Sequence, residues 1–475
     1  MGRPATIPER LATRVPGLDR LLEGGLLVGG VYIVQGVPGA GKTVLANQIA
    51  FEFAKAGGQV VYVTLLAESH ARMLQHLRRM RFYDSSVIPK NLYYLSGFRP
   101  LEEDGLSGLL DVVRQSATSH KAGLLVLDGL VSAEDAAPSL KDYKKFLHEL
   151  QVVLALMGGT ALLLSNAERA NGFRPDHTMV DGIIELSNEI QNVHSRRYLH
   201  VRKLRGAAQV SGRHSFDISD AGIAVHPRIE TRVKPASDDE YVPSVERLGF
   251  GIADLDKMME GGVPNASATM LLGPTGSGKT MLGLQWLAEG ARLDETGIYF
   301  GFFERPPAIL AKSKRVCVGL VEGVERGLVH QLWQRPVEGI VDVVCDRLLN
   351  EVERHEPKRL FMDGLDGLAT AVDIDDRVRE VMTALANELE RRGVTILYSA
   401  ESADLVGPTM RVPFRGVSAI THNMIVLRHA RMRGRICRVL SVLKMRDSGH
   451  DSTLRELLIT DRGILLGDVV TALEA

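Results

Sequence analysis

The chain contains one long sequence pattern twice, and this repeat limits its fold more than any other feature. TRVPGLDRLLEGGLLVGGVYIVQGVPGAGKT, ending at Thr43, matches ERLGFGIADLDKMMEGGVPNASATMLLGPTGSGKT, ending at Thr280. Three pairs of residues keep a nearly constant separation along the chain: Lys42 with Lys279, Asp128 with Asp363, and Lys203 with Lys444. A repeat of this length predicts two similar domains in tandem.

Each copy has the pattern of an α/β domain. Apolar runs of strand length alternate with helical stretches, which predicts a mainly parallel sheet with helices on both faces. In the first copy these runs cover residues 31–34, 60–65, 124–127 and 161–164. A segment rich in proline and charge separates the copies and reads as a linker. We therefore expect a first domain over 1–225, a linker over 226–247 and a second domain over 248–475.

The balance of charge excludes some classes of function. The 475 residues include 57 Lys and Arg against 58 Asp and Glu, so the chain as a whole is not an electrostatic binder of nucleic acid or anionic membrane. Its three cysteines are far apart and fit a reducing cytoplasm. The uncharged stretch 150–167 predicts a helix end, a turn at Gly158 and a buried strand, because its counterpart in the second copy carries charges. We expect no membrane span.

Both copies contain a glycine-rich phosphate-binding motif. GVPGAGKT and GPTGSGKT each follow an apolar strand and precede a helical stretch, which is the context that a P-loop requires. Glycines let successive backbone N–H groups surround phosphates at a helix N-terminus, where the helix dipole favours an anion. We expect Lys42 and Lys279 to neutralise phosphate oxygens, and Thr43 and Thr280 to ligate Mg²⁺. The predicted phosphate-binding glycines are Gly36, Gly39, Gly41, Gly273, Gly276 and Gly278.

Acidic residues follow two buried strands in each copy. Asp128 and Asp363 end apolar runs and are predicted to help hold the magnesium ion, although an aspartate after a strand also caps helices. Glu68 and Glu304 are candidates for the general base that activates the attacking water. We expect them at the end of the strand beside the P-loop strand. A glutamate at a strand end is common, so their shared position in the repeat carries the prediction.

One segment of the second copy is strongly basic. Residues 406–446 contain nine Arg and Lys and no acidic residue. Nucleic acid in a channel, a neighbouring subunit's nucleotide and plain solvent are the alternatives for what faces these charges. Nucleic acid is the weakest of them, because aromatic residues for base stacking are absent between Phe414 and Arg446.

These motifs, with the endings KLRGAAQVSGRHSFDISDAGIAVHP and LKMRDSGHDSTLRELLITDRG, resemble the KaiC family of RecA-like ATPases over nearly the whole chain. The resemblance implies two tandem RecA-like P-loop domains in a double-ring homohexamer, with ATP and Mg²⁺ between subunits. Four basic residues would then approach the ATP that the next subunit holds: Lys203, Arg205, Lys444 and Arg446. Asp220 and Asp461 match positions near its base.

The chain also departs from the family pattern. Clock proteins of the family carry paired glutamates where this chain has Ala67-Glu68 and Phe303-Glu304. Their phosphorylated Ser-Thr pair corresponds to Ser418-Ala419, which leaves Ser418 as the one candidate phosphate acceptor. The tail that engages KaiA in the clock protein is not expected after Ala475, whereas a KaiB-like partner fits the resemblance.

The leading prediction is a KaiC-like ATPase in signalling or timing, with autophosphorylation in the second domain as a further activity. The alternative is a DNA-acting recombinase or helicase of the RecA type. A third reading is a nucleotide-gated scaffold with little turnover. Stimulation by single-stranded DNA and the rate of hydrolysis distinguish the three.

Overall fold

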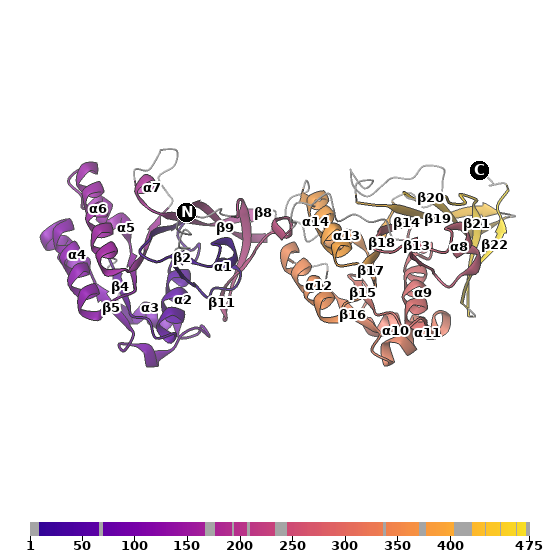
Figure 1. Ribbon diagram of the computed structural model, residues 1–475, viewed down its shortest axis with the longest axis horizontal. Coiled ribbons are helices and arrows are strands. Elements are labelled where there is room, and N and C mark those ends of the chain that lie inside the picture. The colour runs from indigo at the N-terminus through magenta and orange to yellow at the C-terminus, as the bar shows by residue number, and fades with distance from the viewer. Residues whose placement is uncertain are drawn as a thin grey trace, which may run out of the picture. The chain divides into compact units, whose positions relative to one another are not determined.

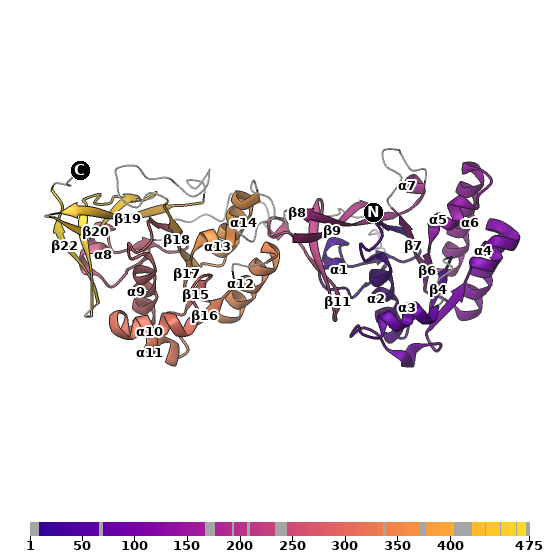
Figure 2. The same cartoon turned by 180° about the vertical axis from the view of Figure 1, so that it is seen from behind.

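The computed structural model describes residues 9–65, 70–166, 176–191, 194–206, 210–232, 245–335, 339–369, 377–402, 420–432, 434–446, 448–461 and 463–471. The chain divides into two compact units, Met1–Arg228 and Ile229–Ala475, which Figures 1 and 2 show from opposite sides. Two of the predicted site residues, Glu68 and Ser418, lie outside the described residues. No described helix is long and apolar enough to cross a membrane.

The first unit is built on a nine-stranded sheet in the order β11-β10-β9-β8-β3-β7-β6-β4-β5. Strands β3 to β8 run parallel to one another. Strands β9 to β11 continue the sheet in antiparallel pairs. The strands are β3 (Val31–Gly36), β4 (Val60–Thr64), β5 (Leu92–Ser96), β6 (Leu124–Asp128), β7 (Thr160–Asn166), β8 (Gly182–Gln191), β9 (His194–Leu204), β10 (Arg213–Ser219) and β11 (Gly222–His226), with a small sheet of β1 (Arg10–Leu11) and β2 (Leu26–Leu27).

Helices cover both faces of this sheet. On one face, α2 packs with α1 and the end of α3 in a hydrophobic core that includes Leu45 and Ile49. On the other face, α4, α5 and α6 pack in a second core that includes Val113 and Leu150 (Figure 1). The helices are α1 (Leu18–Leu21), α2 (Lys42–Lys55), α3 (His70–Leu77), α4 (Phe98–His120), α5 (Leu130–Asp135), α6 (Leu140–Met157) and α7 (Asp176–Met179), and η1 (Ser85–Val87) is a short 3₁₀ turn.

The second unit repeats this architecture with the strand order β16-β15-β17-β18-β14-β19-β20-β21-β22. Its strands are β12 (Arg247–Leu248), β13 (Val263–Pro264), β14 (Ala268–Gly273), β15 (Gly297–Gly301), β16 (Val329–Trp333), β17 (Arg359–Asp363), β18 (Thr395–Glu401), β19 (Asn423–Met432), β20 (Arg435–Lys444), β21 (Arg455–Thr460) and β22 (Gly463–Val469). Its helices are α8 (Ala253–Met258), α9 (Lys279–Arg292), α10 (Pro306–Val316), α11 (Val318–Glu325), α12 (Val341–His355), α13 (Leu365–Ala369) and α14 (Arg377–Arg391). The predicted fold class, two mainly parallel α/β domains with helices on both faces, is confirmed.

The uncharged stretch of the first unit has the predicted form. Helix α6 ends at Met157, Gly158 takes a left-handed conformation with φ of 65°, and β7 begins at Thr160. All but the last residue of β7 are buried, because the strand lies inside the sheet with helices on both sides.

The strand order corrects one expectation. We expected Glu68 and Glu304 at the end of the strand beside the P-loop strand, but β7 and β6 lie between β3 and β4, and β18 and β17 lie between β14 and β15. The chain leaves each P-loop strand through a helix and places its next strand further out, and later strands fill the gap. Consecutive strands are neighbours only about two-thirds of the time, and sequence periodicity does not reveal the exceptions.

The segment after the first unit begins with residues that pack on the second one. Ile229, at the start of η2 (Ile229–Arg232), is 1% exposed, and its N–H donates to Asp342 Oδ1 at 3.0 Å. Arg377, the first residue of α14, forms ion pairs with Glu230 at 2.7 Å and with Asp342 at 2.6 Å. Arg232 pairs with Asp346 on α12. These contacts anchor residues 229–232 in the second unit.

Candidate functional site

Each P-loop connects a buried strand to the N-terminus of a helix. Helix α2 begins at Lys42 and α9 at Lys279, and the residues before them, Gly41 and Gly278, have φ of 106° and 105°. This backbone conformation is one that side chains rarely adopt, so glycine is required there. Gly36 is required for another reason, since a Cβ would lie 2.3 Å from the carbonyl oxygen of Leu186 on β8. The N–H groups at the start of each helix are therefore available to an anion.

The P-loop lysines lie across their own loops. Lys42 Nζ donates to the carbonyl oxygens of Gly36 at 2.7 Å and Val37 at 3.1 Å. Lys279 Nζ makes the same two contacts with Gly273 at 2.6 Å and Pro274 at 2.8 Å. Burial lowers the pKa of Lys279, although nearby carboxylates, including that of Asp363, oppose this shift.

The hydroxyl and the carboxylate predicted to hold magnesium come together in both units. Thr43 Oγ1 donates to Asp128 Oδ2 at 3.1 Å, and Thr280 Oγ1 donates to Asp363 Oδ1 at the same distance. Asp128 ends β6 and Asp363 ends β17, so the sheet and the P-loop helix hold the pair. Hydroxyl and carboxylate oxygens suit Mg²⁺, which takes its other ligands from phosphates and water. The threonine hydroxyl and the aspartate carboxylate therefore fit the predicted magnesium ion. That they bind it stays a prediction.

Tyrosines on the neighbouring strands also reach these carboxylates, and our sequence analysis did not identify them. Tyr62 Oη on β4 donates to Asp128 Oδ2 at 3.0 Å, and Tyr299 Oη on β15 donates to Asp363 Oδ2 at 3.3 Å. Burial raises the pKa of both phenols. Ser399 on β18 adds a bond to Asp363 Oδ1 at 2.7 Å. The tyrosines occupy matching positions in VVYVT and GIYFG. A comparison of the two copies could therefore have indicated a shared role for them.

Burial dominates the electrostatics of the second-unit carboxylate. It raises the pKa of Asp363, although the hydrogen bonds from Ser399, Thr280 and Tyr299 oppose the shift. Glu304 also raises this pKa through its charge, so the two carboxylates lie near enough to interact. A divalent cation would relieve the cost of the buried charge.

The candidate base of the second unit is held by a lysine. Glu304 Oε1 accepts a hydrogen bond from Lys312 Nζ on α10 at 2.6 Å, and both side chains are partly exposed. Phe303, the residue before Glu304, is 62% exposed. The corresponding Glu68 of the first unit lies outside the described residues.

The basic residues of the KLRG motif lie beside the first half of β3, before this strand reaches its P-loop. Lys203 pairs with Ile183, which pairs with Ile33, the third of the six residues of β3. Arg205 N donates to the carbonyl of Asp181, whose carboxylate accepts from Val31 N. The P-loop follows the other end of β3, about 17 Å further at 3.3 Å per residue.

The second unit repeats this placement. Lys444 pairs with Met424, which pairs with Met270 in the first half of β14. Burial lowers the pKa of Lys203 and of Lys444. The charge of Arg205 lowers the pKa of Lys203 further, and the charge of Arg446 does the same for Lys444. The role of these side chains at the ATP of a neighbouring subunit stays a prediction.

Two further side chains contact the second P-loop. Arg438 Nε on β20 donates to the carbonyl of Gly276 at 2.9 Å, and His429 Nε2 on β19 lies 3.1 Å from the carbonyl of Thr275. Both belong to the basic segment 406–446. At least one arginine of the basic segment thus contacts the P-loop of its own unit. The sequence alone does not reveal these contacts, because the residues that make them are more than 150 positions apart.

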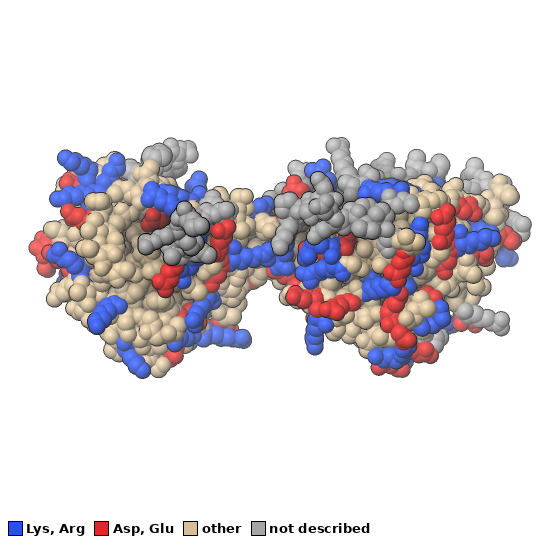
Figure 3. Space-filling view, in the orientation of Figure 1, with Lys and Arg blue, Asp and Glu red and all other residues tan. Residues whose placement is uncertain are grey.

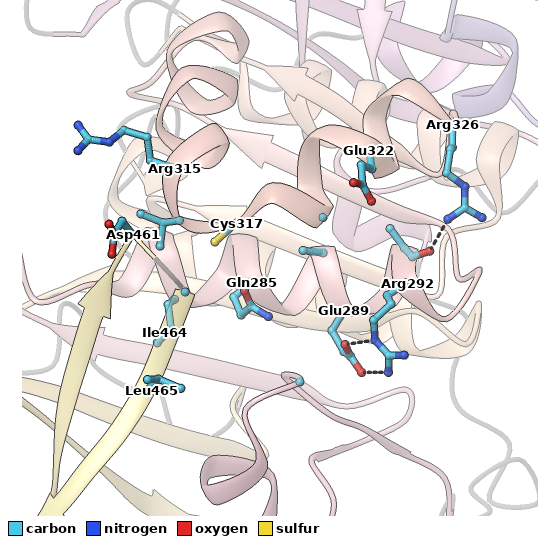
Figure 4. A pocket seen from close by; sticks show the side chains of 16 residues that line it. Gln285, Glu289, Arg292, Arg315, Cys317, Glu322, Arg326, Asp461, Ile464 and Leu465 are labelled. Carbon is cyan, nitrogen blue, oxygen red and sulfur yellow. Dashed lines mark hydrogen bonds and ion pairs between the residues drawn. The ribbon is translucent and has the colours of Figure 1, made fainter.

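Asp461 lines a pocket of about 640 Å³ beside the P-loop helix of the second unit (Figure 4). Residues of α9, of the junction between α10 and α11, and of the β21–β22 turn form its walls: Gln285, Glu289, Arg292, Arg315, Cys317, Asp461, Ile464 and Leu465. Gln285 lies six residues after Lys279, about 9 Å along the helix at 1.5 Å per residue. Asp220 occupies the matching turn of the first unit, where its carbonyl accepts from Arg81 N at 2.7 Å.

The chain is similar to a known family over most of its length. A family model described as "ATPase: KaiC" matches residues 11–230 and 248–469. The "Circadian clock oscillator protein KaiC" of Rippkaea orientalis is 24% identical over 473 residues, which cover 97% of this chain and 89% of that protein. The protein of the same name from Synechococcus elongatus is 24% identical over 477 residues, covering 96% of this chain and 88% of its own. "Circadian clock oscillator protein KaiC 1" of Synechocystis sp. is 23% identical over 466 residues, covering 96% and 88%.

Proposed function

The chain belongs to the KaiC family of ATPases, and from this premise we propose that it binds and hydrolyses Mg-ATP at two sites per chain. One observation carries the proposal. In both units the P-loop threonine and the strand-end aspartate meet at 3.1 Å beside the start of the P-loop helix. The glycines and the lysine of each P-loop would hold the phosphates, and Thr43 with Asp128, or Thr280 with Asp363, would hold the magnesium ion.

The proposed catalytic groups come from two subunits. Glu68 and Glu304 act as general bases for the attacking water, and Lys203, Arg205, Lys444 and Arg446 stabilise the phosphates of a neighbouring subunit's ATP. The position of Arg205 beside the start of β3, away from its own P-loop, supports this division. The pocket lined by Asp461 is a suitable place for the base of the nucleotide, and Asp220 is its counterpart in the first unit.

The proposed assembly is a double-ring homohexamer in the cytoplasm, acting in signalling or timing. The names of the relatives, circadian clock oscillator proteins, support a role in timing, and a KaiB-like partner is part of this proposal. A KaiA-type partner is not part of it. We propose a first domain over 1–225, a linker over 226–247 and a second domain over 248–475, with residues 229–232 of the linker anchored on the second unit.

A serine autokinase activity is the finer part of the proposal. Ser418, which lies outside the described residues, is the proposed acceptor, and Glu304 of the neighbouring subunit is the proposed base. Incubation with labelled ATP and Mg²⁺ followed by peptide mapping tests it. Label on Ser418 that disappears in Glu304→Gln supports the kinase, whereas hydrolysis without label on the chain leaves an ATPase alone.

The main test measures bound nucleotide and turnover for each P-loop variant. Lys42→Ala and Lys279→Ala should each lose one of two bound ATP molecules and the hydrolysis of one site. A Lys279→Ala protein that still binds two ATP per chain would show that the second site is misassigned. Addition of single-stranded DNA should leave the rate unchanged, because the basic segment 406–446 has no aromatic residue after Phe414 on which bases could stack. On the face in view in Figure 3, Lys and Arg lie among Asp and Glu. A strong stimulation would favour the DNA-acting alternative.

A further inference from the structure

A chain of buried hydrogen bonds in the first unit ends on the predicted magnesium ligand Asp128. Tyr94 Oη on β5 donates to Asn47 Oδ1 at 2.7 Å, and Asn47 Nδ2 on α2 donates to Tyr62 Oη at 3.1 Å. Tyr62 Oη then donates to Asp128 Oδ2 at 3.0 Å. Tyr62 and Asn47 are fully buried, and the rings of Tyr62 and Tyr94 lie 5.1 Å apart.

The direction of these bonds follows from the chemistry of the groups. Asn47 Nδ2 also lies 2.8 Å from the backbone carbonyl of Thr43, which can only accept, so the amide places its NH₂ group on that side. The Tyr62 oxygen therefore accepts from Asn47. Its single proton is left for the carboxylate of Asp128, which accepts when ionised. The phenol of Tyr62 can therefore only donate to the carboxylate of Asp128. Asn47 on α2 holds the phenol in place, and Tyr94 on β5 holds Asn47.

We infer that Tyr62 and Tyr299 are positioning residues that hold the carboxylates of Asp128 and Asp363 in the orientation that binds magnesium. The inference deepens the proposed function and rests on it. Groups that hydrogen-bond a metal ligand commonly change metal affinity about 10- to 100-fold when removed, because they fix the ligand's orientation. The same contact occurs in both units, although the chain around it differs.

The second unit offers a natural comparison. Leu284 stands where the first unit has Asn47, and Gln331 pairs with Tyr299 where Tyr94 pairs with Tyr62. The phenol of Tyr299 lies 3.3 Å from Asp363 Oδ2, and Ser399 and Thr280 also bond that carboxylate. We expect Tyr299 to contribute less than Tyr62, because its hydrogen bond to the carboxylate is longer.

The experiment removes one hydroxyl and measures metal binding directly. Tyr62→Phe keeps the ring and is made in the full chain that carries Lys279→Ala, so that only the first site binds nucleotide. Mn²⁺ binding is followed by its EPR signal with a non-hydrolysable ATP analogue, and Mg²⁺ is then titrated in competition. The expected result is about a tenfold weaker metal affinity, with binding of the analogue in EDTA changed less than twofold.

Matched tyrosines control for a merely structural effect. Tyr32 is equally buried, and its hydroxyl accepts from Leu27 N at 2.6 Å, so Tyr32→Phe should leave the metal affinity unchanged. Metal affinity within twofold of the parent in Tyr62→Phe would overturn the inference while leaving the ATPase proposal intact. A parent protein that binds no nucleotide with either metal would overturn the proposed function itself.

Tyr299→Phe in a Lys42→Ala chain asks the same question at the second site, with Tyr398→Phe as its control. Tyr398 is buried and bonds Thr421 and the carbonyl of Ile420. A smaller but measurable loss of metal affinity is expected there. If Tyr62→Phe does not fold, this pair decides the inference, and an unchanged metal affinity in Tyr299→Phe overturns it.

Discussion

Glu390, at the end of α14, shows how burial at one residue makes stability depend on pH. Burial raises its pKa from 4.5 to about 7, and the opposing charge of Arg446 does not cancel the effect. Its Oε1 lies 3.4 Å from His422 Nδ1, and that nitrogen lies 3.1 Å from the N–H of Ala268, from which it accepts. Because that nitrogen accepts from Ala268, it carries no proton and cannot donate a hydrogen bond to a Glu390 carboxylate.

The shift in the pKa of Glu390 predicts a loss of stability with rising pH. Between pH 4.5 and about 7 the folded chain retains a proton that the unfolded chain has lost, so the free energy of unfolding falls across this window and then stays level. Glu390→Gln has nearly the same shape and stays uncharged at every pH. We expect it to stabilise the second unit by about 1–3 kcal/mol at pH 8, and not at pH 4.5.

Denaturant unfolding at several pH values measures the effect of Glu390→Gln. The control is Glu353→Gln, because the Glu353 side chain is 75% exposed and should not alter the pH dependence. A Glu390→Gln protein with the same stability as the parent at pH 8 would mean that Glu390 titrates normally.

At the scale of elements, α9 packs closely on β17 because it has glycine at the contact. A Cβ on Gly283 would lie 2.2–2.4 Å from the ring of the fully buried Phe361. The first unit has Ala46 and Val126 at the equivalent positions, so a larger helix residue accompanies a smaller strand residue. The two copies keep the same fold with different pairs of volumes.

This packing predicts opposite effects for two glycine substitutions. Gly283→Ala should destabilise the second unit by about 1–3 kcal/mol, because the ring of Phe361 must move. Gly319→Ala on α11 should be neutral or stabilising by up to about 1 kcal/mol, since its Cβ would meet only Ala288, at 3.6 Å. Thermal unfolding of both variants checks this. Equal midpoints for the two would argue against close packing of α9.

How much of each element could be predicted depends on how local its causes are. The P-loops were predictable because glycine, lysine and threonine act within eight residues of sequence. The strand order was not, since the position of β4 depends on where β6 and β7 are added later. The bond from Tyr62 to Asp128 joins residues 66 positions apart, so only the comparison of the two copies could have suggested it.

At the scale of the whole molecule, Arg205 of the KLRG motif lies beside the start of β3, whereas the P-loop follows the end of that strand. The side chain of Arg205 is 53% exposed and bonds Asp181 and the carbonyl of Thr178. An arginine that neutralises the γ-phosphoryl oxygens speeds hydrolysis by about 10³-fold or more in NTPases that use one. Because Arg205 lies near the end of β3 opposite its own P-loop, we propose that it acts on the ATP held by another chain.

This arrangement predicts that two inactive variants restore activity when mixed. Lys42→Ala chains retain Arg205, and Arg205→Ala chains retain the P-loop, so about a quarter of the interfaces in randomly mixed rings contain both. Lys279→Ala in every chain silences the second site. ATP hydrolysis should appear on mixing and scale with the fraction of mixed rings. Chains with both Lys42→Ala and Arg205→Ala, mixed with the Arg205→Ala protein, should stay inactive, because no interface then has an intact arginine. Mixed rings without recovered hydrolysis, or full activity of Arg205→Ala alone, would show that Arg205 does not act on a neighbour's ATP.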